Sequence, residues 1–210
     1  MKADSNAKGI RQIVLIRHGQ YVLGVKGDEK KILTELGIKQ ADKTGQRIKE
    51  LLEGQVLYPV KSVHYSTMSR ATETYQHIQP YLPPMAAHQC KPCSMIQEGA
   101  VMRPEPPSLY WSATDEDFTK EGLRVEAAFR NYIHRSVHTH AKSTSNIFVC
   151  HGNVIRYFTM RALQLPPEAW LRLAVSNASI TVLTVYPSGR VSLSQLGDVG
   201  HLPPAMITYN

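Results

Sequence analysis

The 210-residue sequence is poor in cysteine and has no long apolar run. Its three cysteines, Cys90, Cys93 and Cys150, are too few and too odd in number for a disulfide framework, so we expect a reducing compartment. No apolar stretch approaches the roughly 20 residues that a membrane-spanning helix needs, and the polar first nine residues lack the apolar core of a secretory signal. We therefore expect no membrane contact by this chain.

The sequence also lacks a block of like charge. It has 24 Lys and Arg against 17 Asp and Glu, a net charge of +7 that favours acidic ligands. The cations are not gathered in one run, and they are not interleaved with aromatic residues as in a nucleic-acid platform. We interpret the excess as a basic surface plus an anion site, and we expect no nucleic-acid partner.

Two short patterns resemble metal or redox sites, and we interpret both as incidental. Cys90 and Cys93 form a single C-x-x-C in a proline-rich connection, without a second pair. His134 and His138 share the helical spacing of metal ligands, but no carboxylate lies nearby on that helix face. We therefore expect neither a metal nor another cofactor.

Strands and helices alternate along the chain, which predicts an α/β sheet with helices on both faces. The expected strands cover residues 13–16, 60–65, 95–96 and 147–150, with a hairpin over 180–186 and 191–196. The expected helices cover residues 34–52, about 68–78 after a cap at Ser66 or Thr67, 118–140 and 153–163. Chain length predicts one domain over residues 10–210, preceded by a polar tail over residues 1–9.

The first expected strand ends in residues that carry chemistry. The apolar run from Ile13 to Ile16 suits a strand buried on both faces, and Arg17, His18 and Gly19 follow it directly. Ligands of open α/β sheets bind just beyond the carboxyl ends of strands. Arg17 and His18 are therefore candidate site residues, and Gly19 lets the backbone turn closely past them.

Other strand ends carry Arg70, Glu98 and His151. Taken singly, each has a simpler interpretation: Arg70 as a surface charge, Glu98 as a solvated carboxylate, and His151 as a cap. If the strands are neighbours, however, all these side chains point with Arg17 and His18 into a single crevice.

Two histidines, two arginines and one carboxylate suit phosphoryl transfer through a histidine. Positioned cations supply most of the rate acceleration in phosphoryl transfer, because the transition state is loose and its charge lies on three oxygens. His18 would attack phosphorus and Glu98 would give and reclaim a proton. Arg17 and Arg70 would bind the phosphate oxygens. His151 would be an additional charged donor, and no metal would be required.

Four separated motifs resemble those of the histidine phosphatase (phosphoglycerate mutase) superfamily. They are Arg17-His18-Gly19, Ser66-x-x-x-Arg70-Ala71-x-x-Thr74, Glu98-Gly99 and His151-Gly152. The resemblance implies a three-layer α/β/α sandwich with a mostly parallel central sheet and no metal cofactor. It also implies that His18 accepts the phosphoryl group, with supporting roles for His151, Arg17, Arg70 and Glu98.

Residues 126–135, 153–157 and 161–173 resemble, more narrowly, the mitochondrial serine/threonine-protein phosphatases of this family. This implies phosphoprotein substrates, a homodimer or larger homo-oligomer, and a mitochondrial location, the cytoplasm being the alternative. It also implies a membrane anchor upstream in a longer form. True mutases resemble Arg-His-Gly-Glu-Ser-x-Trp-Asn, whereas Gln20 to Gly24 lack the Ser, Trp and Asn.

We therefore expect a metal-independent phosphatase that hydrolyses phosphoserine and phosphothreonine in proteins through phospho-His18. One alternative is a phosphatase of small esters, or a mutase, of the same fold; another is a non-catalytic scaffold that docks phosphoproteins. The proline-rich loop 99–112 would form an apolar rim for a peptide, or else pack onto the domain. The apolar stretch 170–175 would serve a dimer interface or the core.

Overall fold

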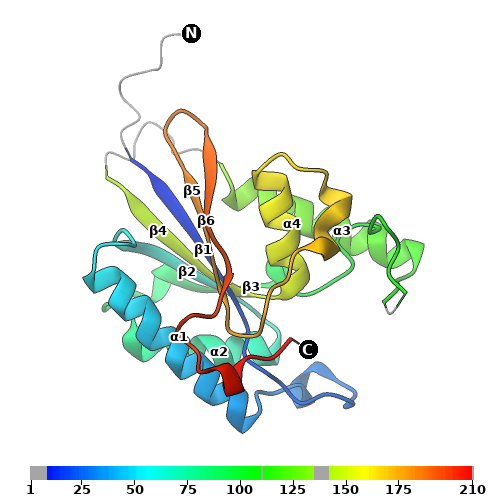
Figure 1. Cartoon of the computed structure of the whole chain (residues 1–210), viewed down its shortest axis with the longest axis horizontal. Helices are drawn as coiled ribbons and strands as arrows, with labels where there is room; N and C mark the ends of the chain where they lie inside the picture. Colours follow the sequence, from blue (N-terminus) through cyan, green and yellow to red (C-terminus); the bar gives the residue numbers. More distant parts are fainter. Residues whose placement is uncertain (1–8, 110, 135–141, 210) are drawn as a thin grey trace.

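A six-stranded sheet forms the centre of the computed structural model, which describes residues 9–109, 111–134 and 142–209 (Figure 1). Its strand order is β3-β2-β4-β1-β5-β6. The strands are β1 (Arg11–Arg17), β2 (Val60–Ser66), β3 (Cys90–Cys93), β4 (Thr144–Cys150), β5 (Ile180–Val185) and β6 (Val191–Asp198). The first four are parallel, and β5 pairs antiparallel with both β1 and β6. Residues 1–8 of the expected tail lie outside the described part.

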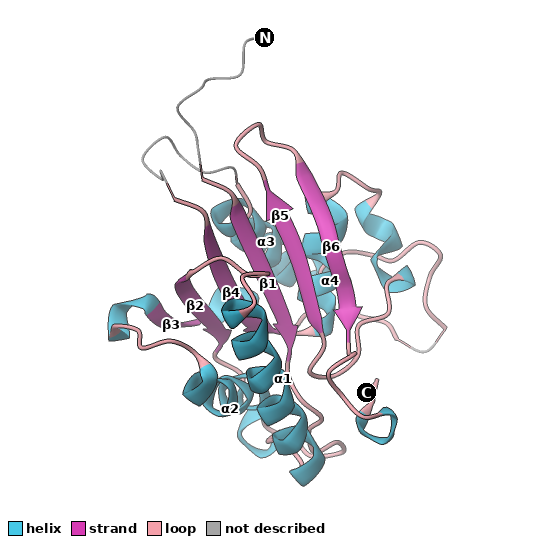
Figure 2. Ribbon diagram, turned by 60° about the vertical axis from the view of Figure 1, so that its left-hand side comes forward, coloured by secondary structure: helices cyan, strands magenta, loops and turns pink. Residues whose placement is uncertain are grey.

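Helices cover both faces of the sheet. Helices α1 (Glu35–Glu53) and α2 (Ser69–Ile78) lie on one face, and α3 (Asp115–Tyr132) and α4 (Gly152–Ala162) on the other (Figure 2). Short 3-10 helices occupy Asp28–Lys30, Gln79–Tyr81, Ala87–Gln89, Ser94–Ile96, Pro167–Arg172 and Pro204–Met206. The predicted three-layer α/β/α sandwich with a mostly parallel sheet is confirmed. None of the helices described combines the length and the apolar character needed to cross a membrane.

The two cores explain the unbroken apolar run of β1. Ile13 and Leu15 pack into the core under α3 and α4, whereas Val14 and Ile16 pack into the core under α1 and α2. All four side chains are fully buried. Because successive side chains of a strand point to opposite faces, a central strand covered on both faces must be apolar at every position.

Helix α1 begins and ends where its sequence predicts. The Thr34 side chain accepts a hydrogen bond from the Gly37 amide at 3.0 Å, and Gly54 follows the last turn. Helix α3 differs from expectation at both ends. It begins after a capping box of Thr114 and Asp117, before the predicted start, and ends at Tyr132 rather than near His140.

The predicted strand at residues 95–96 is wrong, because these residues lie in a 3-10 helix. The strand of this region is β3, which contains the C-x-x-C that we had placed in a connection. Pro92 is tolerated there because β3 lies at the sheet edge and pairs only with β2. All three cysteines are free thiols.

The ends of the proline-rich loop pack onto the domain, as the second of the two interpretations expects, whereas Arg103, Leu109 and residues 105–107 are exposed. Val101 is 3% exposed, and the Trp111 ring meets the buried Trp170 ring edge-on with centroids 5.5 Å apart. The indole of Trp170 donates to the Met102 carbonyl at 3.0 Å. Trp170 and Val175 are both core residues, so the apolar stretch 170–175 gives no evidence for a dimer. Tyr110 lies outside the described residues.

Glu126 of α3 joins three partners from α3 and α4. Its carboxylate accepts from Arg130 Nε at 2.7 Å, from the Tyr157 hydroxyl at 2.9 Å and from Arg161 Nη2 at 2.9 Å. Partial burial opposes the charge of Glu126, but these donors outweigh it and lower its pKa to about 2. The network therefore stabilises the contact between the two helices as long as the carboxylate is ionised.

Glu126→Gln should lower the free energy of unfolding by about 1–2 kcal/mol at pH 7, allowing for partial solvent screening. The folded-state pKa lies below the unfolded value of about 4.3, so the contribution is complete above that value and lost as pH falls toward 2. Urea unfolding at pH 7 and pH 3 measures it. Glu53→Gln, at the exposed Lys49–Glu53 pair, is the control and should change stability by less than about 0.5 kcal/mol. A constant difference between the two pH values would contradict the assignment.

Candidate active site

The five predicted residues come together at the carboxyl ends of the parallel strands. Arg17 and His18 lie at the end of β1, and His151 follows β4, which is the neighbour of β1. Arg70 is the second residue of α2, which follows β2, and Glu98 comes after β3 and a 3-10 helix. We call these five residues the His18 cluster.

His18 is held as a neutral imidazole whose Nε2 carries the lone pair. Its Nδ1 lies 2.8 Å from the Gly19 carbonyl, which can only accept, so Nδ1 carries the hydrogen. Nε2 therefore has the lone pair, and it accepts from Arg70 Nε at 3.2 Å. Burial, and then the charges of Arg17 and Arg70, lower the pKa of His18 well below its ordinary value. A neutral, buried Nε2 beside a cation can attack an electrophilic phosphorus.

Gly19 is required by a close approach of two backbones. A Cβ at Gly19 would lie 2.5 Å from the Gly37 carbonyl oxygen of α1. Because that oxygen belongs to the backbone, no side-chain rotation could relieve the clash. The Gly19 amide donates to Thr74 Oγ1 at 3.0 Å, and that hydroxyl donates to the Arg70 carbonyl at 2.7 Å. Thr74 thus ties the His18 loop to the helix turn that carries Arg70.

Arg17 places a second fixed cation in the cluster. Its side chain is 8% exposed, and Nη1 donates to the Val175 carbonyl at 2.7 Å. Burial lowers the pKa of Arg17 to about 10, against the opposing effect of the Glu98 charge. The guanidinium therefore stays charged at neutral pH and is available to anionic oxygens.

His151 is the residue that we expect to act as a charged donor. Its Nε2 lies 2.8 Å from Ser66 Oγ, and its ring centroid lies 5.0 Å from that of His18. Burial, and then the neighbouring His18 and Arg70, lower the pKa of His151 well below its ordinary value. Without an anion beside it, His151 therefore favours the neutral imidazole, and its expected role as a charged donor to phosphoryl oxygens stays a prediction. A bound phosphate dianion would favour the imidazolium, because an opposite charge nearby raises a histidine pKa.

Glu98 is poised to hold a proton. Burial raises its pKa, against hydrogen bonds from the Gly99 and Asn153 amides and the charge of Arg17. Glu98 Oε1 accepts from Gly99 N at 3.2 Å, and Oε2 accepts from Asn153 N at 3.4 Å. A carboxyl group that keeps its proton above the usual pH suits a general acid.

Two residues that support Glu98, Arg124 and Glu121, were not predicted from the sequence. Arg124 of α3 donates to the carbonyls of Met95, Gln97 and Glu98 at 2.8, 2.9 and 3.2 Å, and Glu121 accepts from the Ala100 amide. Together they hold the loop that carries Glu98. Their spacing of three residues on one helix face was the available signal, but it is common on solvated helices.

The start of α2 also departs from expectation. Neither Ser66 nor Thr67 caps the helix, because its N-cap is Met68, which has no side-chain cap. Ser66 instead binds His151. The Ser69 amide of the first turn, which has no acceptor within the helix, donates to the side chain of Asp28, which lies far away in the sequence. No local pattern marks such a contact.

A cation site could not be assembled from the described side chains. Within residues 9–109, 111–134 and 142–209, no group of three or more His, Cys, Asp or Glu is arranged to hold a metal ion. His134 lies beyond the end of α3. His138 itself lies outside the described residues.

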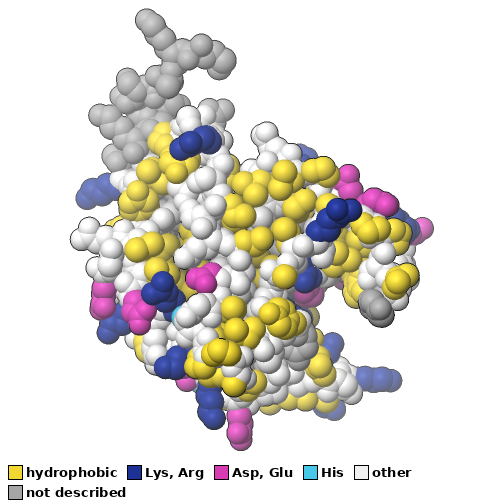
Figure 3. All heavy atoms as spheres, viewed as in Figure 1, with side chains coloured by type: hydrophobic (Ala, Val, Ile, Leu, Met, Phe, Trp, Pro, Cys, Tyr) yellow, Lys and Arg dark blue, Asp and Glu magenta, His cyan; other side chains and the backbone are white. Residues whose placement is uncertain are grey.

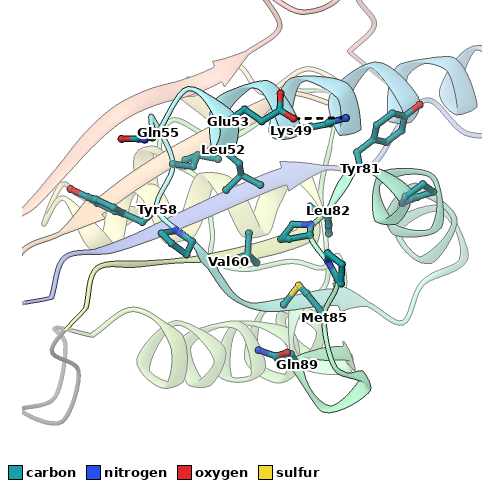
Figure 4. Close-up of a pocket in the computed structure, with 15 residues that line it drawn as sticks. Lys49, Leu52, Glu53, Gln55, Tyr58, Val60, Tyr81, Leu82, Met85 and Gln89 are labelled. Carbon is teal, nitrogen blue, oxygen red and sulfur yellow. Dashed lines mark ion pairs between the residues drawn. The ribbon is translucent and has the colours of Figure 1, made fainter.

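A separate cavity of about 870 Å³ lies beside the start of β2 (Figure 4). Residues from the end of α1, the following loop and segment 80–85 line it, and no member of the His18 cluster does. The Lys and Arg side chains are spread over the visible face of the molecule, as the sequence predicts (Figure 3). Neither feature suggests a second catalytic centre.

A comparison with protein-family models also identifies the His18 cluster with a known family. The model of the histidine phosphatase superfamily (branch 1) matches residues 13–91 and 96–198. The chain belongs to this superfamily. Its matched residues include every member of the His18 cluster.

Relatives with high identity carry a protein phosphatase name. The serine/threonine-protein phosphatase PGAM5, mitochondrial, of Xenopus laevis is 44% identical over 201 residues, covering 96% of this chain and 70% of that protein. The human protein of that name is 45% identical over 203 residues, covering 96% and 67%. The crystal structure of phosphoglycerate mutase from Plasmodium falciparum has a TM-score of 0.65 and 31% identity, covering 94% of this chain and 96% of that one.

The lowered histidine pKa values can be measured directly. At pH 6.5 a free histidine is about half protonated, whereas the rings of His18 and His151 should still be neutral at that pH and well below it. Ring nitrogen NMR shifts, assigned with His18→Asn and His151→Asn, report the protonation of each residue. A midpoint at or above pH 6.5 for His18 would contradict the neutral nucleophile.

Proposed function

We propose that the chain is a metal-independent phosphatase that hydrolyses phosphoserine and phosphothreonine in proteins through phospho-His18. The contact between Arg70 Nε and His18 Nε2, 3.2 Å long, carries this proposal. It sets a permanent cation beside the lone pair of a neutral imidazole. The oxygens of a phosphoryl group would lie next to that cation while the lone pair attacks phosphorus. A docking scaffold would also need arginines for phosphate, but it would have no need for Glu98, whose carboxyl has a raised pKa.

The reaction would proceed in two transfers. Arg17 and Arg70 bind the phosphate oxygens, and Nε2 of His18 forms a bond to phosphorus as the bond to the serine or threonine oxygen breaks. Glu98 gives its proton to the departing oxygen. Water then attacks phospho-His18 and returns a proton to Glu98, and the N–P bond breaks to release phosphate. His151 would donate to the phosphoryl oxygens once the substrate charge favours its protonated form.

The substrate class rests on the relatives. Those named serine/threonine-protein phosphatase are 44% and 45% identical, against 31% for the mutase of known structure. The mutase motif after the nucleophile is also incomplete here, from Gln20 onward. Val101 and Trp111 pack inward, so these two residues of the expected apolar rim do not support the peptide assignment. A small-ester phosphatase or mutase therefore remains the alternative to test.

Three further parts of the proposal concern the whole protein. Residues 10–210 would form a single catalytic domain, because the family match spans most of that range. The location would be mitochondrial, as the names of the relatives state for those proteins. A homodimer or larger homo-oligomer rests on the family resemblance alone.

The phosphohistidine should be trapped by rapid quench. With 32P-labelled phosphoprotein and EDTA present, the wild-type chain should acquire a label that is labile to acid and stable to alkali. His18→Ala should lose both label and turnover, while His88→Ala, at an exposed position, should retain both. An acid-stable label, or turnover by His18→Ala, would refute the nucleophile.

Substrate class is decided by competing substrates. We expect kcat/KM for phosphothreonine peptides to exceed that for 3-phosphoglycerate and 2,3-bisphosphoglycerate. The reason is that Gln20 to Gly24 lack the Ser, Trp and Asn that follow the nucleophile in the mutase motif. A preference for either phosphoglycerate, or exchange between phosphoglycerates, would overturn the protein phosphatase and leave the histidine chemistry intact.

A further inference from the structure

Asp28 connects the loop after His18 to the start of α2. It lies in the first 3-10 helix, within the connection between β1 and α1. Its Oδ2 accepts from the Ser69 amide at 2.9 Å and from the Ser69 hydroxyl at 3.2 Å. Its Oδ1 accepts from Arg70 Nη1 at 3.3 Å. One carboxylate therefore contacts both the backbone and the side chain of the turn that presents Arg70.

The guanidinium of Arg70 is fixed at each of its nitrogens. Nε donates to His18 Nε2 at 3.2 Å, and Nη2 lies 3.7 Å from the sulfur of Met68. Its carbon lies 4.8 Å above the Tyr21 ring. Across the described ranges, the ion pair with Asp28 is the one salt bridge that Arg70 makes. Asp28 thus supplies the strongest directional restraint on the arginine, apart from the nucleophile itself.

The backbone contact acts on the same arginine from a second direction. The N-cap residue Met68 leaves the first amides of α2 without a side-chain acceptor, and the Asp28 carboxylate takes that role from outside the helix. A negative charge at a helix N-terminus is also favourable to the helix dipole. Because Arg70 is the second residue of α2, fixing this turn fixes the point from which its side chain extends.

We propose that Asp28 is a positioning residue that orients Arg70 toward His18 Nε2 and the transferring phosphoryl group. The inference deepens the proposed function and rests on the role of Arg70 within it. Arginine has several rotatable bonds, and a transition-state donor must be held to within about 0.5 Å of its productive geometry. Asp28 provides that restraint through Arg70.

Asp28 is better placed for this role than for blocking the site. Two of its three hydrogen bonds are with Ser69, so the carboxylate is fixed at the start of α2 and does not depend on the arginine for its position. Arg70 is 5% exposed, whereas Asp28 is 39% exposed and lies on the outer side of the pair. The Nε edge of the guanidinium faces His18 and stays directed toward the reacting atoms.

A double-mutant cycle tests whether Asp28 acts through Arg70. Turnover of p-nitrophenyl phosphate is measured for the wild type, Asp28→Ala, Arg70→Ala and the double variant. We expect Asp28→Ala to lower kcat about ten- to a hundredfold, less than the loss of a transition-state donor itself. In the Arg70→Ala background the same change should cost less than about twofold. Glu29→Ala, which removes the neighbouring exposed carboxylate, is the matched control and should keep wild-type kcat.

Thermal unfolding separates positioning from a purely structural effect. If Asp28 only caps α2, Asp28→Ala should lower kcat by the same factor in the wild-type and Arg70→Ala backgrounds, and it should lower Tm by the same number of degrees in both. That result would overturn the proposal. Asp28→Glu keeps the charge and should recover most of the lost kcat. Failure of Asp28→Glu to exceed Asp28→Ala, with Tm retained, would also count against it.

Binding of orthovanadate, measured by calorimetry, keeps this test independent of the proposed reaction. Asp28→Ala should weaken orthovanadate binding at least about fivefold in the wild-type background and not in the Arg70→Ala background, because the oxyanion needs an oriented Arg70. If the wild type binds orthovanadate with this pattern but shows no turnover, the proposed function fails and the positioning role stands. Unchanged affinity in Asp28→Ala, or no orthovanadate binding by the wild type, would overturn the role of Asp28.

Discussion

A permanently charged guanidinium held against the lone pair of a buried, neutral imidazole is the contact on which the His18 cluster depends. The Arg70 Nε to His18 Nε2 hydrogen bond exists only if His18 is unprotonated, and burial with two neighbouring arginines ensures that it is. It also requires the His18 ring to be turned correctly, which the Gly19 carbonyl enforces through Nδ1. The electrostatics and the tautomer therefore support one another, and neither would suffice alone.

The sheet makes this contact possible by bringing distant segments to one edge. Strands β2, β4 and β1 are consecutive neighbours, so the residues following them emerge together although the sequence separates them widely. The doubly buried strands fix the depth of each strand end, because a slip by one residue would exchange the two cores. The close approach of Gly19 to Gly37 then sets the His18 loop against α1. The accuracy of the cluster thus comes from core packing more than from the loops themselves.

The parts of this molecule that sequence could predict are those encoded locally. The buried run of β1, the Thr34 cap and the glycine after His18 each follow from a few adjacent residues. Strand β3 was missed because its role as an edge strand, which admits Pro92, is a property of the sheet. The contact of Asp28 with Ser69 and Arg70 spans about forty residues, and nothing in the sequence near Asp28 announces it. The neutral state of His151 likewise depends on burial, which the sequence does not specify at a strand end.

The protonation states of the cluster place its charge where a substrate needs it. Two histidines held neutral leave Arg17 and Arg70 as the fixed cations of the cluster, which avoids the repulsion that two added imidazolium charges would bring. A phosphate dianion reverses this balance, since it makes a charged His151 favourable beside it while His18 must stay neutral to attack. Ser66, which lies 2.8 Å from His151 Nε2, can accept from that nitrogen when protonated or donate to it when neutral. A hydroxyl is therefore suited to this position, because it pairs with Nε2 of His151 in both states without adding a charge that would shift the histidine pKa before the substrate arrives.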